Sequence, residues 1–300
     1  MARALDGAVK DKPHLQTHAE IHRPPSPVIH SYRAEGIVII KIAKRGSFLC
    51  ILTAIAITLA GGCTNTRIIK LVDGTIVPLP ELVSAMRSSR VVFIGEVHSV
   101  KRYHEVQLIL IKALRDAGVD IAIGMEMFKS ADQLALDEWI AGRLPEADFK
   151  KVYEANWRVP WEQYKDILVY ARANRIPVTG LNISPDVVHQ VFKSGFKSLS
   201  AAQLKNLPGI RCEVNPAYED FIKKSMGGHT ISGAAFANYC EAQMVWDTTM
   251  AWNAVNYLKG HPEKTLVVMA GGGHSWRHGI PEQISRLSDT PSLVIFLELS

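Results

Sequence analysis

The sequence has few cysteines, and none of them is spaced to form a zinc knuckle or a redox motif. Its 300 residues include four, Cys50, Cys63, Cys212 and Cys240, and no C-x-x-C pair. Four cysteines are too few for a disulfide scaffold. Hydrophobic residues make up 47% of the chain and charged residues 21%. The chain can therefore form a sizeable core, and disorder throughout is excluded.

Beyond its N-terminal segment the chain also lacks an excess of charge of either sign. The formal net charge is +5, and residues 1–63 alone carry +4, with eight Lys or Arg against four Asp or Glu. The basic character therefore belongs to the N-terminal segment. Composition gives no support to a nucleic-acid-binding surface, so no nucleic-acid partner is expected.

The motifs of several enzyme classes are missing too. The segment His104–Leu108 begins with His-Glu but lacks the second histidine of a zincin helix, and Gly-x-Ser-x-Gly does not occur. Neither Lys nor a Gly-x-x-Gly spacing follows Gly271–Gly273, which argues against a phosphate-binding loop.

The N-terminal segment indicates export. Three basic residues within 41–45 precede an apolar run of about a dozen residues, which ends at Gly61-Gly62-Cys63. The run is short for a membrane span, which needs about 20 residues. It resembles a bacterial lipoprotein signal, in which the cysteine is lipidated. We therefore expect a lipoprotein signal peptide at residues 41–63 with Cys63 as the lipidation site; a plain signal peptide or an anchoring helix is the alternative.

Residues 1–40 precede this signal and are expected to be a disordered leader. They are polar and contain Pro24-Pro25-Ser26-Pro27 together with four scattered histidines. Signal peptides seldom carry such a leader, so translation is expected to begin nearer Val38. The histidines could bind metal, although spaced histidines in proline-rich polar sequence are more often inert.

Residues 64–300 read as a single α/β domain. Short apolar runs at residues 91–95, 121–125, 176–180, 266–270 and 293–298 are typical of strands buried on both faces. Helical periodicity separates the first three runs, including a helix at 161–173. This alternation predicts a mainly parallel sheet with flanking helices.

The segment between the third and fourth predicted strands has no strand pattern. Residues at about 184–260 read as helical, including helices at 216–226 and 234–258. We interpret this segment as a helical insertion that caps the sheet. Residues 66–78 are expected to form a small hairpin at the entry to the domain.

Histidine and carboxylate side chains follow the strands of the predicted sheet. Ligands of open α/β sheets bind beyond the carboxyl ends of the strands, where this chain places Glu96 and His98, then Glu126, then His274. His104 follows at the start of a helix. These residue types are the ligand set of a transition metal or the acid–base set of a hydrolase. Each alone is often a helix cap or an ion-pair partner, so the hypothesis depends on their coincidence.

One acid lies on the expected core face of the helix at 234–258. Asp247 belongs to an apolar stripe at helical spacing, and a buried acid must be paired or bound to something. A structural ion pair with an Arg or a His near the sheet edge is its more common explanation.

Five separated motifs resemble the ChaN-type family of haem-binding lipoproteins, which shares a superfamily with the Tiki and TraB proteins and the erythromycin esterases. The motifs, in order, are Gly95-Glu96-x-His98 with His104 and Gln107, Gly124-x-Glu126-Met127, Gly180-Leu181-Asn182, Gln243-x-x-x-Asp247-x-x-Met250-Ala251 and Ala270-Gly-x-Gly-His274. The likeness covers roughly residues 85–298.

This resemblance implies a lipid-anchored protein of the bacterial cell envelope, at the outer membrane, with a role in haem or iron uptake. Haem, a second copy of the chain and an outer-membrane haem or iron receptor are the partners it implies. Haem needs an axial Tyr or His, an apolar slot and nearby cations. An aromatic group at 157–164 could line a haem face or belong to the core. The residues expected to bind haem are His98, Tyr103, His104, Asp247 and His274.

The wider superfamily implies a different function, a metal-dependent hydrolase of amides or esters. The metal, such as Zn, Mn or Fe, would be held by Glu96, His98, Glu126 and His274, with Glu96 and Glu126 also as the catalytic carboxylates. A third hypothesis is a structural lipoprotein that has kept the fold without the chemistry. The sequence favours a haem-binding protein over an enzyme.

Overall fold

The computed structural model of the chain describes residues 37–42, 66–70, 76–205, 207, 214–226 and 232–299. Its strands are β1 (Ile37–Ile42), β2 (Thr66–Lys70), β3 (Val91–Glu96), β4 (Ile121–Lys129), β5 (Val178–Asn182), β6 (Thr265–Gly271) and β7 (Ser292–Leu299). Its α-helices are α1 (Leu79–Arg87), α2 (Lys101–Asp116), α3 (Gln133–Ile140), α4 (Glu146–Asn156), α5 (Trp161–Ala173), α6 (Pro185–Ser194), α7 (Ala201–Lys205), α8 (Pro216–Ser225), α9 (Gly233–Gly260), α10 (Gly272–Ser275) and α11 (Ile280–Leu287). Two 3-10 turns, at Ser130–Asp132 and Phe196–Ser198, complete the regular structure of these residues.

The strands of the described residues form one sheet in the order β2-β1-β7-β3-β6-β4-β5. Neighbouring strands from β1 to β5 are parallel, and only β2 runs antiparallel, against β1. The predicted α/β fold with a mainly parallel sheet is confirmed. Its central strands are buried along their length, which explains their near-continuous apolar sequences.

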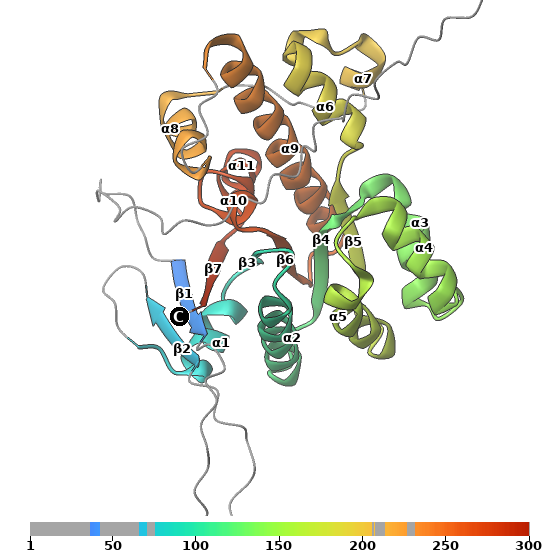
Figure 1. Ribbon diagram of the computed structural model, residues 1–300. Helices are drawn as coiled ribbons and strands as arrows, with labels where there is room; N and C mark the ends of the chain where they lie inside the picture. The colour runs from blue at the N-terminus through green and yellow to red at the C-terminus, as the bar shows by residue number, and fades with distance from the viewer. Residues whose placement is uncertain are drawn as a thin grey trace, which may run out of the picture.

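Helices lie on both faces of the sheet (Figure 1), and each face contributes to its own apolar layer. On one face, side chains of β3, β4, β6 and β7 pack with helices α1 to α5. On the other face, the alternate side chains of the same strands pack with α9 and α11. Since successive residues of a strand point to opposite faces, each buried strand contributes to both layers.

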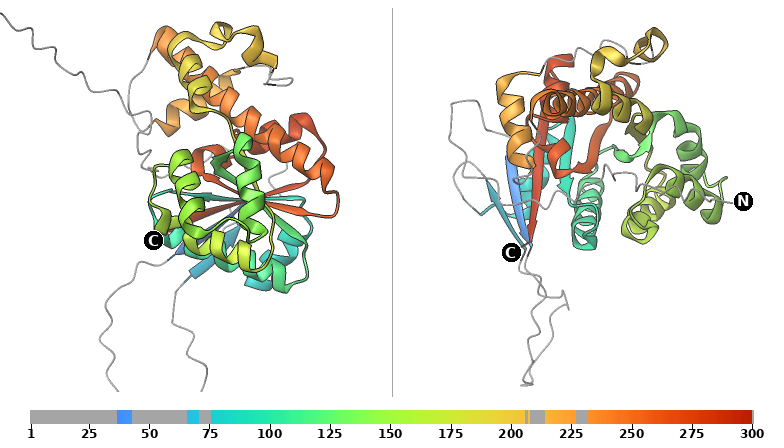
Figure 2. Two further views of the ribbon diagram at one scale, coloured as in Figure 1. Left: turned by 90° about the vertical axis from the view of Figure 1, so that its right-hand side faces the viewer. Right: turned by 45° about the horizontal axis from the view of Figure 1, so that its top comes forward.

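The predicted helical insertion between β5 and β6 is confirmed. Helices α6 to α8 and the N-terminal half of α9 stand beyond the sheet on one side of the molecule (Figure 2). α9 contains 28 residues, so it is about 42 Å long. Its N-terminal half packs with α6 and α8, and its C-terminal half packs on the sheet. α9 therefore joins the insertion to the sheet and its site.

The largest differences from the predicted strand boundaries are in β4 and β5. β4 continues four residues further, to Lys129, and its register against β5 shifts between Met125 and Lys129. β5 begins at Val178 rather than at residue 176. Pro177 has no N–H group for a ladder, although its carbonyl accepts a hydrogen bond from the Ile123 N–H.

The N-terminal strands also differ from the prediction. β2 pairs with β1 and not with a strand of a local hairpin at 66–78, and residues 71–75 lie outside the described residues. β1 takes residues 37–40 from the predicted disordered leader, because the sequence Ile-Val-Ile-Ile-Lys-Ile is rich in β-branched residues. The rest of the leader, the signal segment after residue 42, Cys63 and Cys212 lie outside the described residues. Within the part that is described, no helix is both long enough and apolar enough to cross a membrane.

Candidate functional site

Glu96, the last residue of β3, is the acceptor at the centre of the site. Its side chain is buried, and Oε1 accepts hydrogen bonds from His98 Nδ1, at 2.8 Å, and from the Tyr164 hydroxyl. Oε2 accepts a 2.6 Å hydrogen bond from Gln107 Nε2 on α2. Burial by itself would raise the pKa of this carboxyl group, but hydrogen bonds with His104 and His98 hold the pKa well below its usual range. Glu96 is therefore a buried carboxylate anion.

Glu96 orients the imidazole of His98. With Nδ1 bound to Glu96, Nε2 of His98 faces Glu126, at 3.8 Å from Oε1. The His98 side chain is 28% exposed, and the Trp157 ring meets its edge with centroids 4.9 Å apart. Burial lowers the pKa of His98, but Glu126 and Glu96 outweigh burial, so the pKa is raised. His98 thus presents an oriented nitrogen at a partly open position.

Glu126 lies between two imidazoles. It belongs to β4, and Oε2 accepts a 2.7 Å hydrogen bond from the Gly271 N–H at the end of β6. Oε1 is 3.8 Å from His98 Nε2 and 3.7 Å from His274 Nε2. Asn182 of β5 donates a 2.6 Å hydrogen bond to the Glu126 carbonyl, which fixes the backbone here.

His274, on α10, is the counterpart of His98. Its Nδ1 is 2.6 Å from Asp247 Oδ1 on α9, and Asp247 Oδ2 accepts a 2.8 Å hydrogen bond from the Tyr218 hydroxyl on α8. The Trp246 ring packs beside His274 with centroids 4.8 Å apart. Burial lowers the pKa of His274, but the carboxylates of Glu126 and Asp247 raise it to about 9. For Asp247, burial prevails and raises the pKa.

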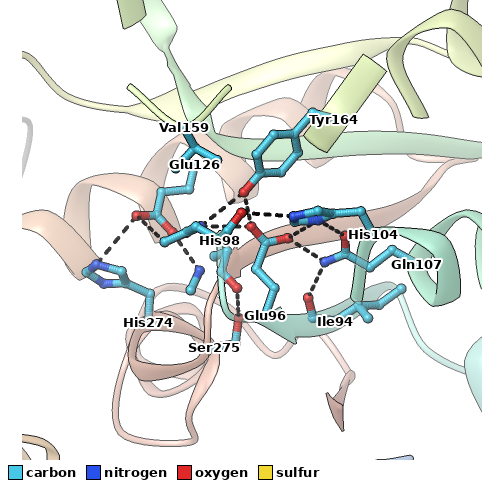
Figure 3. A network of polar contacts seen from close by, with 12 residues as sticks. Ile94, Glu96, His98, His104, Gln107, Glu126, Val159, Tyr164, His274 and Ser275 are labelled. Atoms are coloured by element: carbon cyan, nitrogen blue, oxygen red, sulfur yellow. Dashed lines mark hydrogen bonds and ion pairs between the residues drawn. The ribbon is translucent and has the colours of Figure 1, made fainter. Parts of the chain in front are cut away.

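The site therefore repeats one arrangement on both sides of Glu126. A tyrosine donates to a buried carboxylate, the carboxylate orients an imidazole through Nδ1, and Nε2 faces Glu126. Figure 3 shows the half made by Tyr164, Glu96 and His98, together with Glu126 and His274. Carboxylate–histidine pairs of this kind fix the tautomer and direction of imidazoles that bind metals or transfer protons.

The structure brings together five of the predicted site residues: Glu96, His98, Glu126, Asp247 and His274. The expected ion pair of Asp247 with a histidine at the sheet edge is confirmed. These residues come from β3, the following loop, β4, α9 and α10, and they meet at the carboxyl edge of the sheet as the topology predicts.

Two predicted haem-binding residues are corrected. His104 is 2% exposed, with Nδ1 beside Gln107 Oε1 and Nε2 beside the His98 carbonyl, so both ring nitrogens are already hydrogen-bonded. Tyr103 is 6% exposed and packs in the apolar layer with Val106 and Leu110. The first turn of α2 points both side chains inward, so neither can contact a ligand in front of His98.

Sequence reasoning missed the two tyrosines of the site as hydrogen-bond donors. In the sequence, Tyr164 is a candidate only for an aromatic wall or the core, and Tyr218 does not stand out. Tyr218 lies 29 residues before Asp247, in a segment with no motif, so no sequence signal joins them. For Tyr164 the only signal is its place in the apolar stripe of α5, which a core residue shares.

The histidine and carboxylate side chains of the site are of the types that bind transition metals, but they are not close enough together to form a metal site. Among the residues that the structure describes, no three His, Cys, Asp or Glu side chains are close enough to hold a metal ion. His98, Glu126 and His274 come nearest to such a group. Glu96 binds the Nδ1 side of His98, facing away from Glu126, so the prediction of Glu96 as a direct ligand is corrected to a residue that orients a ligand.

For haem iron, the fit rests on His98. A Cβ atom added at Gly271 would lie 2.8 Å from His98 Nε2, so the backbone of Gly271 approaches this nitrogen closely and a larger residue would not fit there. Trp157 supplies an apolar wall beside the imidazole. An oriented imidazole on a side chain that is 28% exposed, with an aromatic wall beside it, has the chemistry of the axial side of a haem group.

A three-layer α/β fold with a histidine–carboxylate site at the carboxyl edge of its sheet defines the class of protein. Residues 82–284 match the family described as "Haem-binding uptake, Tiki superfamily, ChaN", and the chain belongs to this family.

Solved structures and a curated protein are similar to this chain. The structure titled "Cofacial heme binding to ChaN of Campylobacter jejuni" superposes with a TM-score of 0.61 at 16% identity, over 75% of this chain and 88% of that chain, and this likeness shows the fold. A mutant of the erythromycin esterase EreC, in its open conformation, gives a TM-score of 0.46 at 12% identity, over 72% of this chain and 71% of that one. Protein RETICULATA-RELATED 5, chloroplastic, of Arabidopsis thaliana is 24% identical over 231 residues, 70% of this chain. The match spans 31% of the Arabidopsis protein.

Proposed function

We propose that this protein binds haem in the uptake of haem or iron, and that His98 is the residue that meets the iron. Membership of the haem-binding uptake family supports haem as the ligand. The observation that carries the choice of residue is the hydrogen bond from His98 Nδ1 to buried Glu96, which fixes the direction of Nε2 on a side chain that is 28% exposed. Haem bound there would supply an iron centre, and Glu96 would hold the imidazole in the tautomer that ligates iron.

A titration of hemin into the full chain tests this proposal. The wild-type protein is expected to give a saturable shift of the Soret absorption band, and His98→Ala is expected to weaken binding by about tenfold or more, the range for loss of a site's orienting partner or ligand. His189→Ala, on α6 outside the site, is the matched control and should titrate like the wild type. A wild-type titration without a Soret shift would refute haem binding.

The cellular setting is part of the same proposal. Lipid attached at Cys63 would hold the protein at the bacterial outer membrane, where a haem or iron receptor and a second copy of the chain are the expected partners. Basic residues, an apolar run and the Gly-Gly-Cys ending at residues 41–63 support this setting. The wild-type protein should leave membranes only with detergent, and Cys63→Ser should be recovered in an aqueous wash.

A second candidate function, hydrolysis, is favoured by one observation. Two imidazoles with carboxylate-bound Nδ1 atoms face the same carboxylate, Glu126, at 3.7 and 3.8 Å. Such groups hold and move protons at Nε2 and at Glu126 Oε1, and a Zn, Mn or Fe ion would supply a Lewis acid there. Amide or ester hydrolysis that is lost in Glu126→Gln and His98→Ala, with stoichiometric metal in the wild type, would establish this function. Hydrolysis that survives both substitutions would refute it.

A further inference from the structure

His104 is a buried histidine that contacts the site without facing a ligand. It lies in the first turn of α2 and is 2% exposed. Figure 3 shows its ring beside Glu96 and Gln107. A histidine of this kind is either neutral, with a hydrogen on one ring nitrogen, or an imidazolium, with a hydrogen on both. The oxygen atoms beside the two nitrogens decide between these forms.

The side-chain amide of Gln107 fits in one orientation only. Its Nε2 is 2.6 Å from Glu96 Oε2 and 3.0 Å from the Ile94 carbonyl oxygen. A backbone carbonyl and a carboxylate anion are both acceptors, so the amide nitrogen donates one hydrogen to each. If the amide were turned over, its oxygen would lie against two acceptors. Gln107 Oε1 is therefore the atom that faces His104.

Both ring nitrogens of His104 face oxygens that can only accept a hydrogen bond. Nδ1 is 3.0 Å from Gln107 Oε1 and 3.4 Å from Glu96 Oε2, and Nε2 is 3.0 Å from the His98 carbonyl oxygen. Since none of these oxygens has a hydrogen to give, each nitrogen must supply one. A neutral ring would place a nitrogen lone pair against an acceptor. The hydrogen bonds therefore require the imidazolium form.

The surroundings compensate for the burial of this positive charge. A buried charge is costly unless it is paired and hydrogen-bonded. The Glu96 carboxylate supplies the opposite charge, 3.4 Å from Nδ1. The Tyr164 ring packs on the imidazole with centroids 4.2 Å apart, within the distance at which an aromatic ring attracts a cation. Both N–H groups of the imidazolium make charge-assisted hydrogen bonds, which are stronger than neutral ones.

The two hydrogen bonds of His104 hold two different parts of the support of His98. Nε2 donates to the His98 carbonyl and so fixes the backbone of this residue. Nδ1 lies beside Oε2 of Glu96, whose other oxygen accepts from His98 Nδ1. One residue of α2 therefore fixes the backbone of His98 directly and the direction of its ring through Glu96. Neither contact involves His98 Nε2, so His104 acts through other groups.

We propose that His104 is a positioning residue that acts as a buried imidazolium. It donates a hydrogen bond from each ring nitrogen, and the two bonds hold Glu96 and the His98 backbone in the geometry that presents His98 Nε2. The protonation of His104 follows from its hydrogen bonds, whatever ligand the site binds. Its effect on ligand binding rests on the proposed function, in which His98 meets haem iron.

NMR spectroscopy of the full chain with isotope-labelled histidine tests the imidazolium form. The wild type is expected to show two N–H protons on the His104 ring at about pH 7.5, where a histidine with the ordinary pKa of about 6.5 is mostly neutral. Through-space contacts with the Tyr164 ring identify these signals without a substitution, and both signals should disappear in His104→Gln. A single ring N–H proton on His104 would overturn the inference.

Hemin titrations of His104→Asn and His104→Gln test the positioning role. Asparagine can keep a donor near the place of Nδ1, and glutamine one near the place of Nε2, but neither keeps both bonds or the charge. Each is expected to weaken hemin binding by about tenfold or more, as loss of a partner that orients a ligand does. The ring nitrogen chemical shifts of His98 should change in both variants.

Leu110→Ala is the matched control. Leu110 is also a buried residue of α2, and it packs in the apolar layer. Its truncation should lower stability but keep the hemin affinity and the His98 ring shifts of the wild type. A residue of α2 that only stabilises the fold would behave in this way.

The outcomes separate this inference from the proposed function. Hemin affinity and His98 ring shifts like those of the wild type in both His104 variants would overturn the positioning role and leave haem binding intact. No Soret shift in the wild type would refute haem binding. In that case the N–H protons of His104 and the ring shifts of His98 would still decide the role of His104.

Discussion

Glu96 accepts hydrogen bonds from Tyr164, Gln107 and His98, and His104 Nδ1 lies 3.4 Å from its Oε2. Glu96→Ala would leave Tyr164, Gln107 and His98 Nδ1 without this common acceptor. Removing one partner of a buried charged network costs about 3–5 kcal/mol. We expect a loss of this size in the free energy of unfolding, measured by urea denaturation.

Glu105→Ala is the control for this prediction. Glu105 also lies at the start of α2, but its carboxylate pairs with Arg102 at the surface. Exposed pairs contribute at most about 1 kcal/mol, so this substitution should change stability little. Equal losses in the two variants would show that Glu96 is not the structural centre of the site.

His274 should make stability depend on pH. Its pKa rises from 6.5 to about 9 on folding, so the folded state binds this proton more tightly than the unfolded state. The resulting stabilisation is complete below pH 6.5 and is lost as the pH rises through 9. We expect the free energy of unfolding to fall by roughly 2–3 kcal/mol over this interval because of His274.

The comparison that checks this is His274→Gln against His189→Gln, each unfolded in urea at about pH 6 and about pH 9.5, on either side of the titration. His274→Gln should reduce the difference in the free energy of unfolding between the two pH values, and His189→Gln should preserve that difference. An undiminished difference in His274→Gln would assign the pH dependence to other groups.

At the residue scale, the sequence predicts the charged groups of the site and not the tyrosines that orient them. Glu96, His98, Glu126 and His274 are predictable because strand ends meet at one edge of a parallel sheet. Asp247 is predictable because an acid interrupts an apolar helical stripe. The two tyrosines occupy positions that suit an ordinary core tyrosine, so only three-dimensional structure shows where their hydroxyl groups point.

At the scale of elements, the shifted register of β4 against β5 depends on Gly180. A Cβ atom at this position would lie 2.5 Å from the Lys129 carbonyl oxygen, which is backbone and cannot move freely. Gly180→Ala should therefore reduce stability by about 2–3 kcal/mol, as overpacking against a fixed backbone does. Thermal unfolding measures this loss.

Gly260→Ala is the matched control for that prediction. Gly260 ends α9, and a Cβ atom there would meet no other atom within 4 Å. Alanine has a higher helix propensity than glycine and gives the unfolded chain fewer conformations. The free energy of unfolding should therefore be unchanged or slightly higher. A Gly180→Ala variant as stable as Gly260→Ala would show that β4 and β5 can slide to accommodate the side chain.

The order of helices and strands along the chain is largely predictable from the sequence. The pairing of the two N-terminal strands, β1 and β2, is not. Five buried strands stand out as apolar runs, and the helix at 161–173 has the predicted bounds. The sequence predicts a strand at the position of β2, but its partner β1 ends before a segment with the pattern of a signal peptide. The hydrophobic pattern of a segment shows where a strand lies. It does not show which distant strand it pairs with, because that depends on which edge of the sheet is free.

At the scale of the whole molecule, β1 contributes to stability through its position between β7 and β2. Its six residues pair with Val294–Leu299 of β7. A protein consisting of residues 64–300 lacks this strand, so its urea midpoint should be lower than that of residues 37–300. Equal midpoints would mean that β2 takes the place of β1 beside β7, or that the ladder adds no stability.

Because β1 precedes Cys63, a complete sheet and a lipidated N-terminus at Cys63 exclude each other. Cleavage before Cys63 separates β1 from the chain and gives β7 a free edge of backbone N–H and C=O groups. A precursor and a mature form would then differ inside the fold as well as at its end. The rate of amide hydrogen exchange along β7 would report which form a cell contains.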